Sequence, residues 1–472
     1  MNVGLIYLNQ STRAIPLGLI YIATYVMEKD ASINTKIIDM NFEDVIDTIK
    51  KAKFDIIGIN AMTVEYGEAI KIAHKIRRET SAPLITGGPH ISTLPESLDP
   101  IFDIGVIGEG EQTMHELTQV FKRDGKFNQD NLSEVDGLVY RKEGQLFYTN
   151  PRTLVPNLDS FPIPDYSLAN RRYFQYRNLN TWGEFGIETC IITSRGCPYK
   201  CIFCSTTQLW KRVRQHSPEY VAKTVEYLVD EFNVDHIQIW DDLFTINKTR
   251  LRSVAQLFKE NGITKKVKFN CQPRANLIDE EFCDILIDLN IPLILFGFES
   301  GSDRILKLLK GGKVSVEQNK NAISMCVRRG IKVQGSVIFG SPGESLEDMQ
   351  KTLDFIDFAI KAKADRIWSF VMTPFPATKI WEIAKERGKV SNNMDWSLLS
   401  HQNIDHPLLL DDDIPIKEFV KIFKKGRAKL NRMKWNKIRS FIKNNFWDTV
   451  KYVLSNPNAI KLTIWQVISK RE

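Results

Sequence analysis

Three cysteines within eight residues carry the strongest chemical signal in this sequence. Cys197, Cys201 and Cys204 have the spacing C-x3-C-x2-C and follow directly on the segment 193–196. A structural zinc site normally takes four protein ligands, often from two separated pairs, whereas iron–sulfur clusters are held by closely spaced cysteine thiolates. Because the other four cysteines are isolated, the spacing favours a four-iron cluster with one iron open to a further ligand.

Two other interpretations of these cysteines remain open from the residues alone. A zinc ion could be completed by a distant histidine, or the three side chains could pack in a core strand. The second is disfavoured by Pro198, Tyr199 and Lys200, which are typical of a loop. A total of seven cysteines is odd, which argues against a disulfide framework.

Further polar and small residues stand where apolar runs end, downstream of the cysteines. Asp241 and Asp242 could bind a ligand or cap the next helix. Arg274 could bind a carboxylate through its planar fork or form a structural salt bridge. Glu299 lies in an otherwise apolar run, where an unpaired carboxylate is costly, so a ligand partner is attractive. Gly340 could admit a ligand close to the backbone or simply make a turn.

The segments between these residues predict the element that positions them. Six strand-like runs alternate with helical patterns between residues 188 and 390, which predicts a full or partial parallel β/α barrel. Active sites of barrels lie at the carboxyl ends of the strands, where the residues above are expected. The expected strands cover residues 189–193, 236–240, 267–271, 293–298, 332–339 and 366–372.

Residues 1–125 show a second alternation, which predicts an open, doubly wound parallel sheet. Such sheets bind ligands beyond the carboxyl ends of their strands. The expected strands are 3–7, 36–39, 55–59, 83–86 and 104–107, and the expected helices are 19–28, 43–51, 65–78 and 111–122. The loops at the carboxyl edge would then be 9–18, 60–63, 87–90 and 108–111.

The remaining segments are a connector and a tail. Residues 126–187 contain a short hairpin pattern and a Pro-rich stretch at 156–164 that resists helix and sheet. Residues 391–472 are expected to form a helical C-terminal region that ends in a basic amphipathic tail. The predicted fold class is therefore α/β, with an N-terminal doubly wound sheet, a parallel barrel and a helical tail.

The formal net charge of +7 is a property of the tail. Residues 417–472 contain 15 Lys or Arg and 3 Asp or Glu, so the rest of the chain is nearly neutral, and we expect no nucleic-acid partner. Two interpretations of the tail remain open: a helix packed on the barrel, and a peripheral contact with an anionic membrane. Its apolar positions recur every three or four residues: Trp435, Ile438, Ile442, Phe446, Val450 and Val453.

The expected location of the protein is the cytoplasm, or the inner face of the membrane if the tail binds lipid. The longest apolar stretch, residues 17–27, is too short to span a bilayer. The N-terminus has neither the charged start nor the cleavage site of a signal peptide.

From the cysteine loop to residue 344 the chain resembles the radical S-adenosylmethionine (SAM) superfamily. The cysteine spacing, the aromatic residue before the last cysteine and the segments 239–245, 297–302 and 335–344 carry the likeness. The resemblance implies that Cys197, Cys201 and Cys204 ligate a [4Fe–4S] cluster whose open iron takes the amino and carboxylate groups of SAM. It also implies cleavage of SAM to methionine and a 5′-deoxyadenosyl radical. The SAM-binding residues expected from it are Phe203, Asp241, Asp242, Arg274, Glu299, Ser336 and Gly340.

Residues 1–125 resemble the cobalamin-binding domain that precedes the barrel in one branch of that superfamily. Segments 15–19, 60–63, 87–90 and 107–111 match in order and spacing. The D-x-H-x-x-G motif, whose histidine binds cobalt in other cobalamin domains, does not occur here. The cobalamin-binding residues implied are Pro16, Leu17, Gly18, Met62, Thr63, Gly87, Gly88, His90, Gly108, Glu109 and Gly110, with His90 as a candidate cobalt ligand or a structural histidine.

These features together predict a radical SAM enzyme, with cobalamin-dependent methylation of an unactivated carbon as the leading hypothesis. The alternatives are a radical cyclisation or rearrangement of a lipid, isoprenoid or tetrapyrrole substrate, and a non-enzymatic iron–sulfur scaffold or sensor. Expected partners are a small-molecule or lipid-like substrate and a reductant such as flavodoxin or ferredoxin. His401 and His406 lie in the segment 373–416, which is expected near the substrate, where either could donate protons or be structural.

Overall fold

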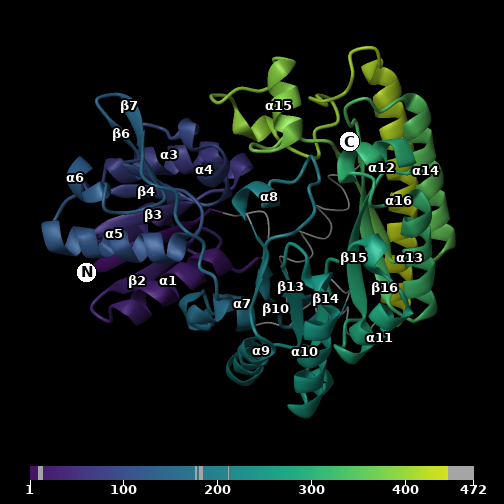
Figure 1. Cartoon of the computed structure of the whole chain (residues 1–472), viewed down its shortest axis with the longest axis horizontal. Helices are drawn as coiled ribbons and strands as arrows, with labels where there is room; N and C mark the ends of the chain where they lie inside the picture. Colours follow the sequence, from purple (N-terminus) through teal and green to yellow (C-terminus); the bar gives the residue numbers. More distant parts are fainter. Residues whose placement is uncertain (9–13, 176–177, 180–183, 211, 445–472) are drawn as a thin grey trace.

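The protein contains two large sheets side by side, the first mixed and the second parallel, each covered by helices, with a long C-terminal helix along the outer side of the second (Figure 1). The computed structural model describes residues 1–8, 14–175, 178–179, 184–210 and 212–444. The alternation of strands and helices expected in both halves of the sequence is confirmed.

The N-terminal sheet has the strand order β2-β1-β3-β4-β5-β6-β7, and its first five strands in this order are parallel. The order reverses direction between β1 and β3, and a crevice for a ligand forms at such a switch point. The strands are β1 (Asn2–Tyr7), β2 (Asn34–Asp39), β3 (Ile56–Asn60), β4 (Leu84–Gly87) and β5 (Ile104–Val106). The helices are α1 (Leu17–Lys29), α2 (Val45–Lys51), α3 (Tyr66–Arg77), α4 (Pro89–Thr93) and α5 (Gly110–Asp124).

The hairpin expected in the connector belongs to this sheet instead. Strand β6 (Leu138–Lys142) pairs antiparallel with β5, and β7 (Gln145–Tyr148) pairs with β6. The pairing satisfies backbone groups that β5 would otherwise expose as an edge, and Leu138 and Val139 are fully buried. The first structural unit therefore extends beyond residue 125, through α6 (Gln129–Leu132) to the end of β7.

The second sheet is an open partial barrel of six parallel strands in chain order, with β10 and β17 at its edges. Its strands are β10 (Glu188–Ile191), β13 (His236–Ile239), β14 (Lys268–Cys271), β15 (Leu293–Glu299), β16 (Lys332–Phe339) and β17 (Arg366–Val371). The helices between and after them are α9 (Pro218–Phe232), α10 (Lys248–Glu260), α11 (Glu280–Asp288), α12 (Asp303–Lys310), α13 (Val316–Arg328), α14 (Leu346–Lys361) and α15 (Lys379–Glu386).

The segment after the Pro-rich stretch packs between the two sheets. The backbone N–H of Asp165 donates to Thr24 Oγ1 of α1 at 2.8 Å, and the buried Tyr166 hydroxyl donates to the carbonyl of Cys190 in β10 at 2.7 Å. One apolar core contains side chains of both sheets, including Val3 of β1 and Ile237 of β13. The two units are therefore held as one packed body.

Helix α16 (Ile416–Asn444) lies against α14 and β17. Phe419 and Phe423 are fully buried, which supports the packed-helix interpretation for this part of the tail. The residues on which the membrane interpretation depends, 435–453, lie outside the part whose side chains are described. Within the described residues, no helix has the length and apolar character needed to cross a bilayer.

Candidate functional site between the two sheets

The cysteine loop is an excursion from a two-stranded ribbon at the carboxyl end of β10. Strand β11 (Ser194–Arg195) leads into the loop, and β12 (Arg214–Gln215) follows it and pairs antiparallel with β11. The loop is also held by backbone hydrogen bonds, from Ile202 N–H to the carbonyl of Leu309 at 3.0 Å and from Ile380 N–H to the carbonyl of Ile202 at 3.2 Å. Ile202 and Phe203 pack against the second apolar core.

The three cysteines of this loop are half-buried and carry free thiols. Burial raises the pKa of Cys197 and of Cys204. Among the residues that the structure describes, no three His, Cys, Asp or Glu side chains converge closely enough to hold a single metal ion. Three thiols on one loop are compatible with a cluster, because each thiolate of a cluster binds a different iron atom.

Arg274 is the cation next to the cysteines. Its Nη1 donates to Cys201 Sγ at 3.2 Å, and its guanidinium lies 3.6 Å from the centre of the Tyr199 ring. A positive charge here favours the thiolate form that a metal requires. Its Nη2 is buried and has no hydrogen-bond partner among the described residues, so it is available for the predicted contact with a carboxylate.

Asp241 and Asp242, which follow β13, hold the cysteine loop and the residues before it through hydrogen bonds. Asp241 is buried and accepts hydrogen bonds from Thr193 N–H, Thr193 Oγ1 and Ser194 Oγ at 2.6–2.7 Å. Burial raises its pKa in spite of these bonds. Asp242 accepts from Gly196 N–H at 2.8 Å and from Thr206 Oγ1 at 2.9 Å, on either side of the cysteines. Both carboxylates therefore serve the fold, and Asp242 also lines the cavity described below.

Glu299 has a protein partner that the sequence did not reveal. It lies at the end of β15 with φ +61°, and its Oε1 is 3.0 Å from Nζ of Lys310. Both side chains are less than a tenth exposed. Lys310 also donates to the carbonyl of Gly297 at 2.5 Å. The expected need for a partner is met within the chain, and a SAM contact of Glu299 remains a prediction.

The end of β16 holds the last two predicted SAM-binding residues. Ser336 is half-buried within the strand. Gly340 follows it with φ +77°, a conformation that favours glycine. Its N–H donates to Glu344 Oε2 at 2.7 Å, while Glu344 Oε1 is buried with no partner among the described residues. Burial raises the pKa of Glu344 to about 8.

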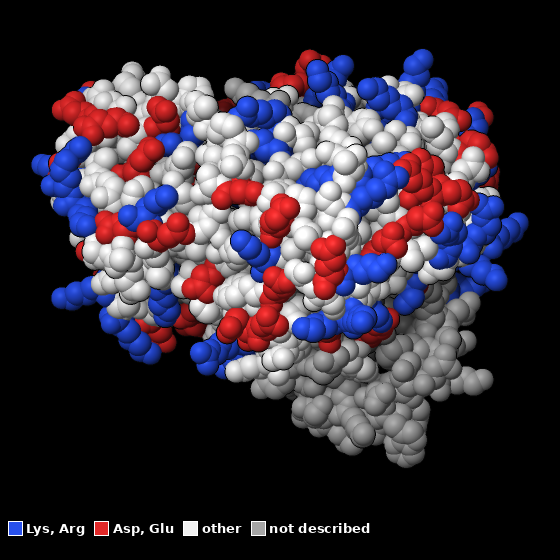
Figure 2. All heavy atoms as spheres, turned by 60° about the horizontal axis from the view of Figure 1, so that its bottom comes forward, with Lys and Arg blue, Asp and Glu red and all other residues white. Residues whose placement is uncertain are grey.

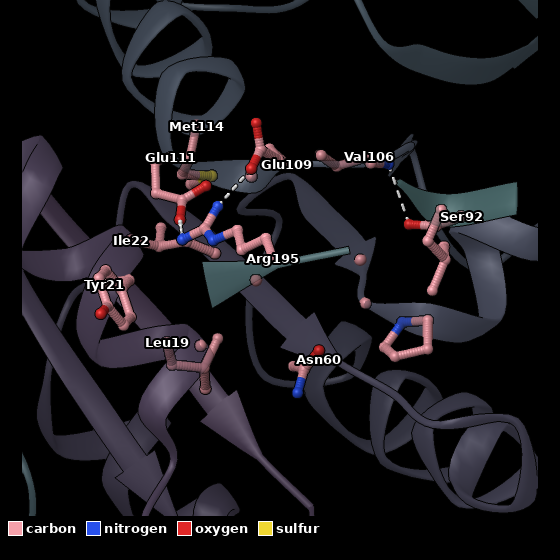
Figure 3. A pocket seen from close by; sticks show the side chains of 18 of the residues that line it. Leu19, Tyr21, Ile22, Asn60, Ser92, Val106, Glu109, Glu111, Met114 and Arg195 are labelled. Carbon is pink, nitrogen blue, oxygen red and sulfur yellow. Dashed lines mark hydrogen bonds and ion pairs between the residues drawn. The ribbon is translucent and has the colours of Figure 1, made fainter. Parts of the chain in front are cut away.

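A cavity of about 410 Å³ lies between the carboxyl edge of the N-terminal sheet and the ribbon that carries the cysteine loop (Figure 3). From the ribbon side it is lined by Ser194, Arg195, Trp210 and Asp242. From the N-terminal sheet it is lined by most of the predicted cobalamin-binding residues: Gly18, Met62, Gly87, Gly88, Gly108, Glu109 and Gly110. Of the residues predicted to bind SAM, Asp242 lines this cavity, so the predicted cobalamin site borders the base of the cysteine loop.

Glycines give the cavity wall its shape. Gly88 has φ +98°, and a Cβ on it would come within 2.2 Å of Asn60 Oδ1, so no other residue fits there. A Cβ on Gly18 or on Gly108 would meet no atom within 4 Å, because both backbones border open space. A ligand can therefore approach the backbone closely along this edge.

Four predicted cobalamin-binding residues do not line the cavity: Pro16, Leu17, Thr63 and His90. His90 is fully buried, packed between the rings of Tyr66 and Trp396, with Nε2 2.9 Å from Ser97 Oγ. Burial lowers its pKa to about 3, so the ring is neutral. Among the described lining residues there is no histidine, which favours the structural alternative for His90.

Glu109 is engaged by two arginines of the ribbon. Arg195 and Arg214 both donate to its carboxylate. Burial opposes its ionisation, but the hydrogen bonds from Arg214 and the charge of Arg195 outweigh burial and lower the pKa of Glu109. Its carboxylate therefore has an internal role, and its backbone remains at the cavity edge.

His401 and His406, the two histidines of the C-terminal segment, lie at the surface. The carbonyl of His401 accepts from Val371 N–H at the end of β17, and its ring packs edge-on against Phe370 at 4.8 Å. His406 is exposed. Neither lines the cavity.

Comparison with known proteins identifies the chain. The model of the radical SAM superfamily matches residues 191–356, and that of the B12 binding domain matches residues 6–118. An uncharacterized methyltransferase of Pyrococcus horikoshii is 33% identical over 390 residues, which are 80% of this chain and 79% of that protein. The chain belongs to the radical SAM superfamily. Its N-terminal sheet is a B12-binding domain.

Two further comparisons bear on fold and function. The anaerobic magnesium-protoporphyrin IX monomethyl ester cyclase of Cereibacter sphaeroides is 24% identical over 361 residues, 74% of this chain and 56% of the cyclase. The solved structure of the radical SAM methyltransferase TsrM from Kitasatospora setae, with cobalamin and a [4Fe–4S] cluster bound, has a TM-score of 0.70. The match is 18% identical and covers 92% of this chain and 88% of that one, so the two proteins share the fold.

The cofactors of this radical SAM enzyme are a [4Fe–4S] cluster, SAM and cobalamin, and the residues present fit them. Three thiols share one loop beside Arg274, whose Nη2 has no partner in the part of the chain that the structure describes, which suits a cluster with an adjacent carboxylate ligand. The glycine-lined edge of the B12-binding domain borders the cavity, as a large planar ring requires.

Sequence reasoning missed several residues that the structure places at the site. Lys310 faces Glu299, Arg195 and Arg214 face Glu109, and Trp210 lines the cavity. Only Arg195 carried a local signal, since it stands two residues before Cys197.

Proposed function

We propose that this radical SAM enzyme methylates an unactivated carbon of a small-molecule substrate in a cobalamin-dependent reaction. The observation that carries the proposal is the cavity of about 410 Å³ lined by both the B12-binding domain and the base of the cysteine loop. A methyl group carried by cobalamin at the glycine-lined wall of the cavity would then lie beside the base of the cysteine loop. The similarity to a Pyrococcus horikoshii protein named as a methyltransferase supports the same reaction.

Within this proposal each part of the chain has a role. Cys197, Cys201 and Cys204 hold the cluster, and Arg274 supplies a cation beside it. Asp242 fixes the loop on both sides of the cysteines. When bound, the cluster supplies the electron that cleaves SAM, and cobalamin carries the methyl group. The walls are mainly apolar, with Leu19, Ile22 and Met114 among them, which favours the burial of an organic ligand over water.

The experiment uses the anaerobically reconstituted full chain with hydroxocobalamin and SAM labelled in its methyl group. We expect about one cobalamin retained per chain after gel filtration, deoxyadenosine release after reduction, and label on the bound cobalamin. Wild-type protein that retains a cluster but no cobalamin would refute the methylation proposal and leave cyclisation or rearrangement as the leading reaction.

A matched pair of variants tests whether the cavity is the cobalamin site. Gly18→Phe directs a ring into the cavity, since a Cβ at Gly18 meets no atom within 4 Å. Gly67→Phe is the control, because its Cβ also meets no atom within 4 Å but Gly67 does not line the cavity. We expect Gly18→Phe to lose cobalamin and keep its cluster, and Gly67→Phe to keep both. Equal cobalamin retention by the two variants would place the cofactor elsewhere.

A radical cyclase is the second candidate, because 74% of this chain is similar to the Cereibacter sphaeroides cyclase. The same experiment separates the two. A cyclase releases deoxyadenosine with substrate without moving the labelled methyl group, whereas a methyltransferase moves it. For either reaction we propose an external reductant of the flavodoxin or ferredoxin class as the electron donor.

A further inference from the structure

Four charged side chains join the B12-binding domain to the base of the cysteine loop. Arg195 Nη1 donates to Glu109 Oε1 at 2.5 Å, and its Nη2 donates to Glu111 Oε1 at 2.6 Å. Arg214 donates to both oxygens of Glu109, at 2.9 and 3.0 Å. We call Glu109, Glu111, Arg195 and Arg214 the bridging cluster. Each pair spans 84 or more residues of sequence, so the bridging cluster is purely tertiary.

The two halves of the bridging cluster come from segments that border the two cofactor sites. Both glutamates stand at the start of α5, directly after the last loop at the carboxyl edge of the N-terminal sheet. Both arginines stand on the ribbon, directly opposite each other in the β11–β12 pair. Because Arg195 precedes Cys197 by two residues, the bridging cluster holds the start of the cysteine loop.

The bridging cluster is buried and electrically balanced. The four side chains are between 2% and 9% exposed, with two carboxylates against two guanidiniums. The guanidinium of Arg195 also lies 5.1–5.9 Å from the rings of Tyr21, Phe161 and Trp210. Removing one partner of such a set leaves a buried charge without compensation and is strongly destabilising. The four side chains are therefore expected to keep this arrangement.

The bridging cluster is also part of the cavity wall. Figure 3 shows Arg195 reaching between Glu109 and Glu111, with Tyr21 and Met114 beside them. Glu109, Glu111 and Arg195 all line the cavity. A ligand that fills the cavity therefore touches the same guanidinium that holds the root of the cysteine loop.

We propose that Arg195 is a positioning residue that couples occupancy of the cobalamin cavity to the geometry of the cysteine loop, so that cobalamin and SAM bind cooperatively. This rests on the cofactor sites assigned under the proposed function. The planar fork of arginine is needed because it holds two carboxylates at fixed positions at once. A lysine keeps the charge but offers one ammonium group, which cannot hold both carboxylates in this geometry.

The test measures binding rather than turnover. The affinity of the cluster-loaded full chain for SAM is determined by anaerobic equilibrium dialysis, with and without saturating hydroxocobalamin. For wild type we expect cobalamin to tighten SAM binding at least about fivefold, the lower end of typical coupling between sites. In Arg195→Lys we expect the coupling ratio, the SAM affinity with cobalamin divided by the affinity without it, to fall below about twofold.

Two further variants keep the test decisive. Glu111→Gln removes one of the two carboxylates that Arg195 bridges, and it applies if Arg195→Lys fails to fold. Arg123→Lys is the control, since Arg123 bridges Asp124 and Glu134 on the exposed surface of the same domain. The electron paramagnetic resonance spectrum of the reduced cluster gives a second readout. We expect cobalamin to change it in wild type and in Arg123→Lys, and to leave it unchanged in Arg195→Lys.

The outcomes distinguish this inference from the proposed function. Wild-type protein that binds both cofactors independently, or an Arg195→Lys variant that keeps the full coupling ratio, overturns the positioning role alone. Wild-type protein that binds no hydroxocobalamin overturns both the positioning role and the cobalamin site. A variant that loses its cluster altogether shows a structural role instead and also overturns the inference.

Discussion

Replacement of Lys310 by methionine tests the environment of Glu299 most directly. Both side chains are buried, at 6% and 7% exposure, with 3.0 Å between Nζ and Oε1. Methionine keeps the length of the apolar stem but leaves the carboxylate of Glu299 without a counter-charge. Breaking a buried pair in this way costs about 3–5 kcal/mol. For a unit of 150–250 residues this corresponds to a fall in unfolding temperature of roughly 6–20 °C.

The assay is thermal unfolding of the cluster-free chain under reducing conditions, with Lys307→Met as control. Lys307 lies on the same helix α12 but is exposed, and we expect its replacement to change stability by less than about 0.5 kcal/mol.

The double variant Glu299→Gln/Lys310→Met supplies the internal check. Removing the carboxylate as well removes the uncompensated charge, so we expect the double variant to be more stable than Lys310→Met. The reasoning is wrong if Lys310→Met and Lys307→Met unfold at the same temperature, or if the double variant is less stable than Lys310→Met.

Three other predictions follow from the site. Cys201→Ala should lose both the visible absorption of the cluster and deoxyadenosine release, and retention of either would refute its assignment as a ligand. His90→Ala should retain hydroxocobalamin within about twofold of wild type, because His90 is buried away from the cavity; a tenfold loss would restore it as a cobalt ligand. Burial raises the pKa of Glu344 from its ordinary 4.5 to about 8, so the folded chain binds this proton more tightly than the unfolded chain. Stability should therefore fall as pH rises from about 5 to 8, by on the order of 3–5 kcal/mol, and Glu344→Gln should flatten that slope in denaturant unfolding.

The strands could be predicted from the sequence to within two residues, because their signal is local. Apolar β-branched runs bounded by Gly, Pro and Asp are set by nearest neighbours. The strand expected at 332–339 is β16 as observed, and those expected at 236–240 and 366–372 are each one residue longer than β13 and β17. The hairpin β6–β7 was assigned to the connector because its partner strand, β5, lies more than 30 residues earlier.

The site was predictable in its chemistry but not in its internal pairing. The cysteine loop and the glycines of the cavity wall can be recognised in the sequence by residue type and spacing. The partners of Glu109 and Glu299 do not, since a carboxylate in a motif looks the same whether a ligand or an arginine faces it. Arg195 is 86 residues from Glu109, and only the docking of the two sheets brings them together. His90 illustrates the reverse, since its loop lies at the expected edge while Trp396 of the C-terminal segment covers its ring.

The bridging cluster also limits the modularity of the chain. Separation at the Pro-rich stretch would produce the barrel alone, as a minimal fragment for SAM cleavage. Here the cut would remove Glu109 and Glu111 from Arg195 and Glu109 from Arg214, and it would take away the Tyr21 ring beside the guanidinium of Arg195. We therefore expect the barrel produced alone to be less stable than the full chain, because two buried guanidiniums would lose their counter-charges. For the same reason we expect a barrel that evolved without an N-terminal unit to carry uncharged residues at positions 195 and 214.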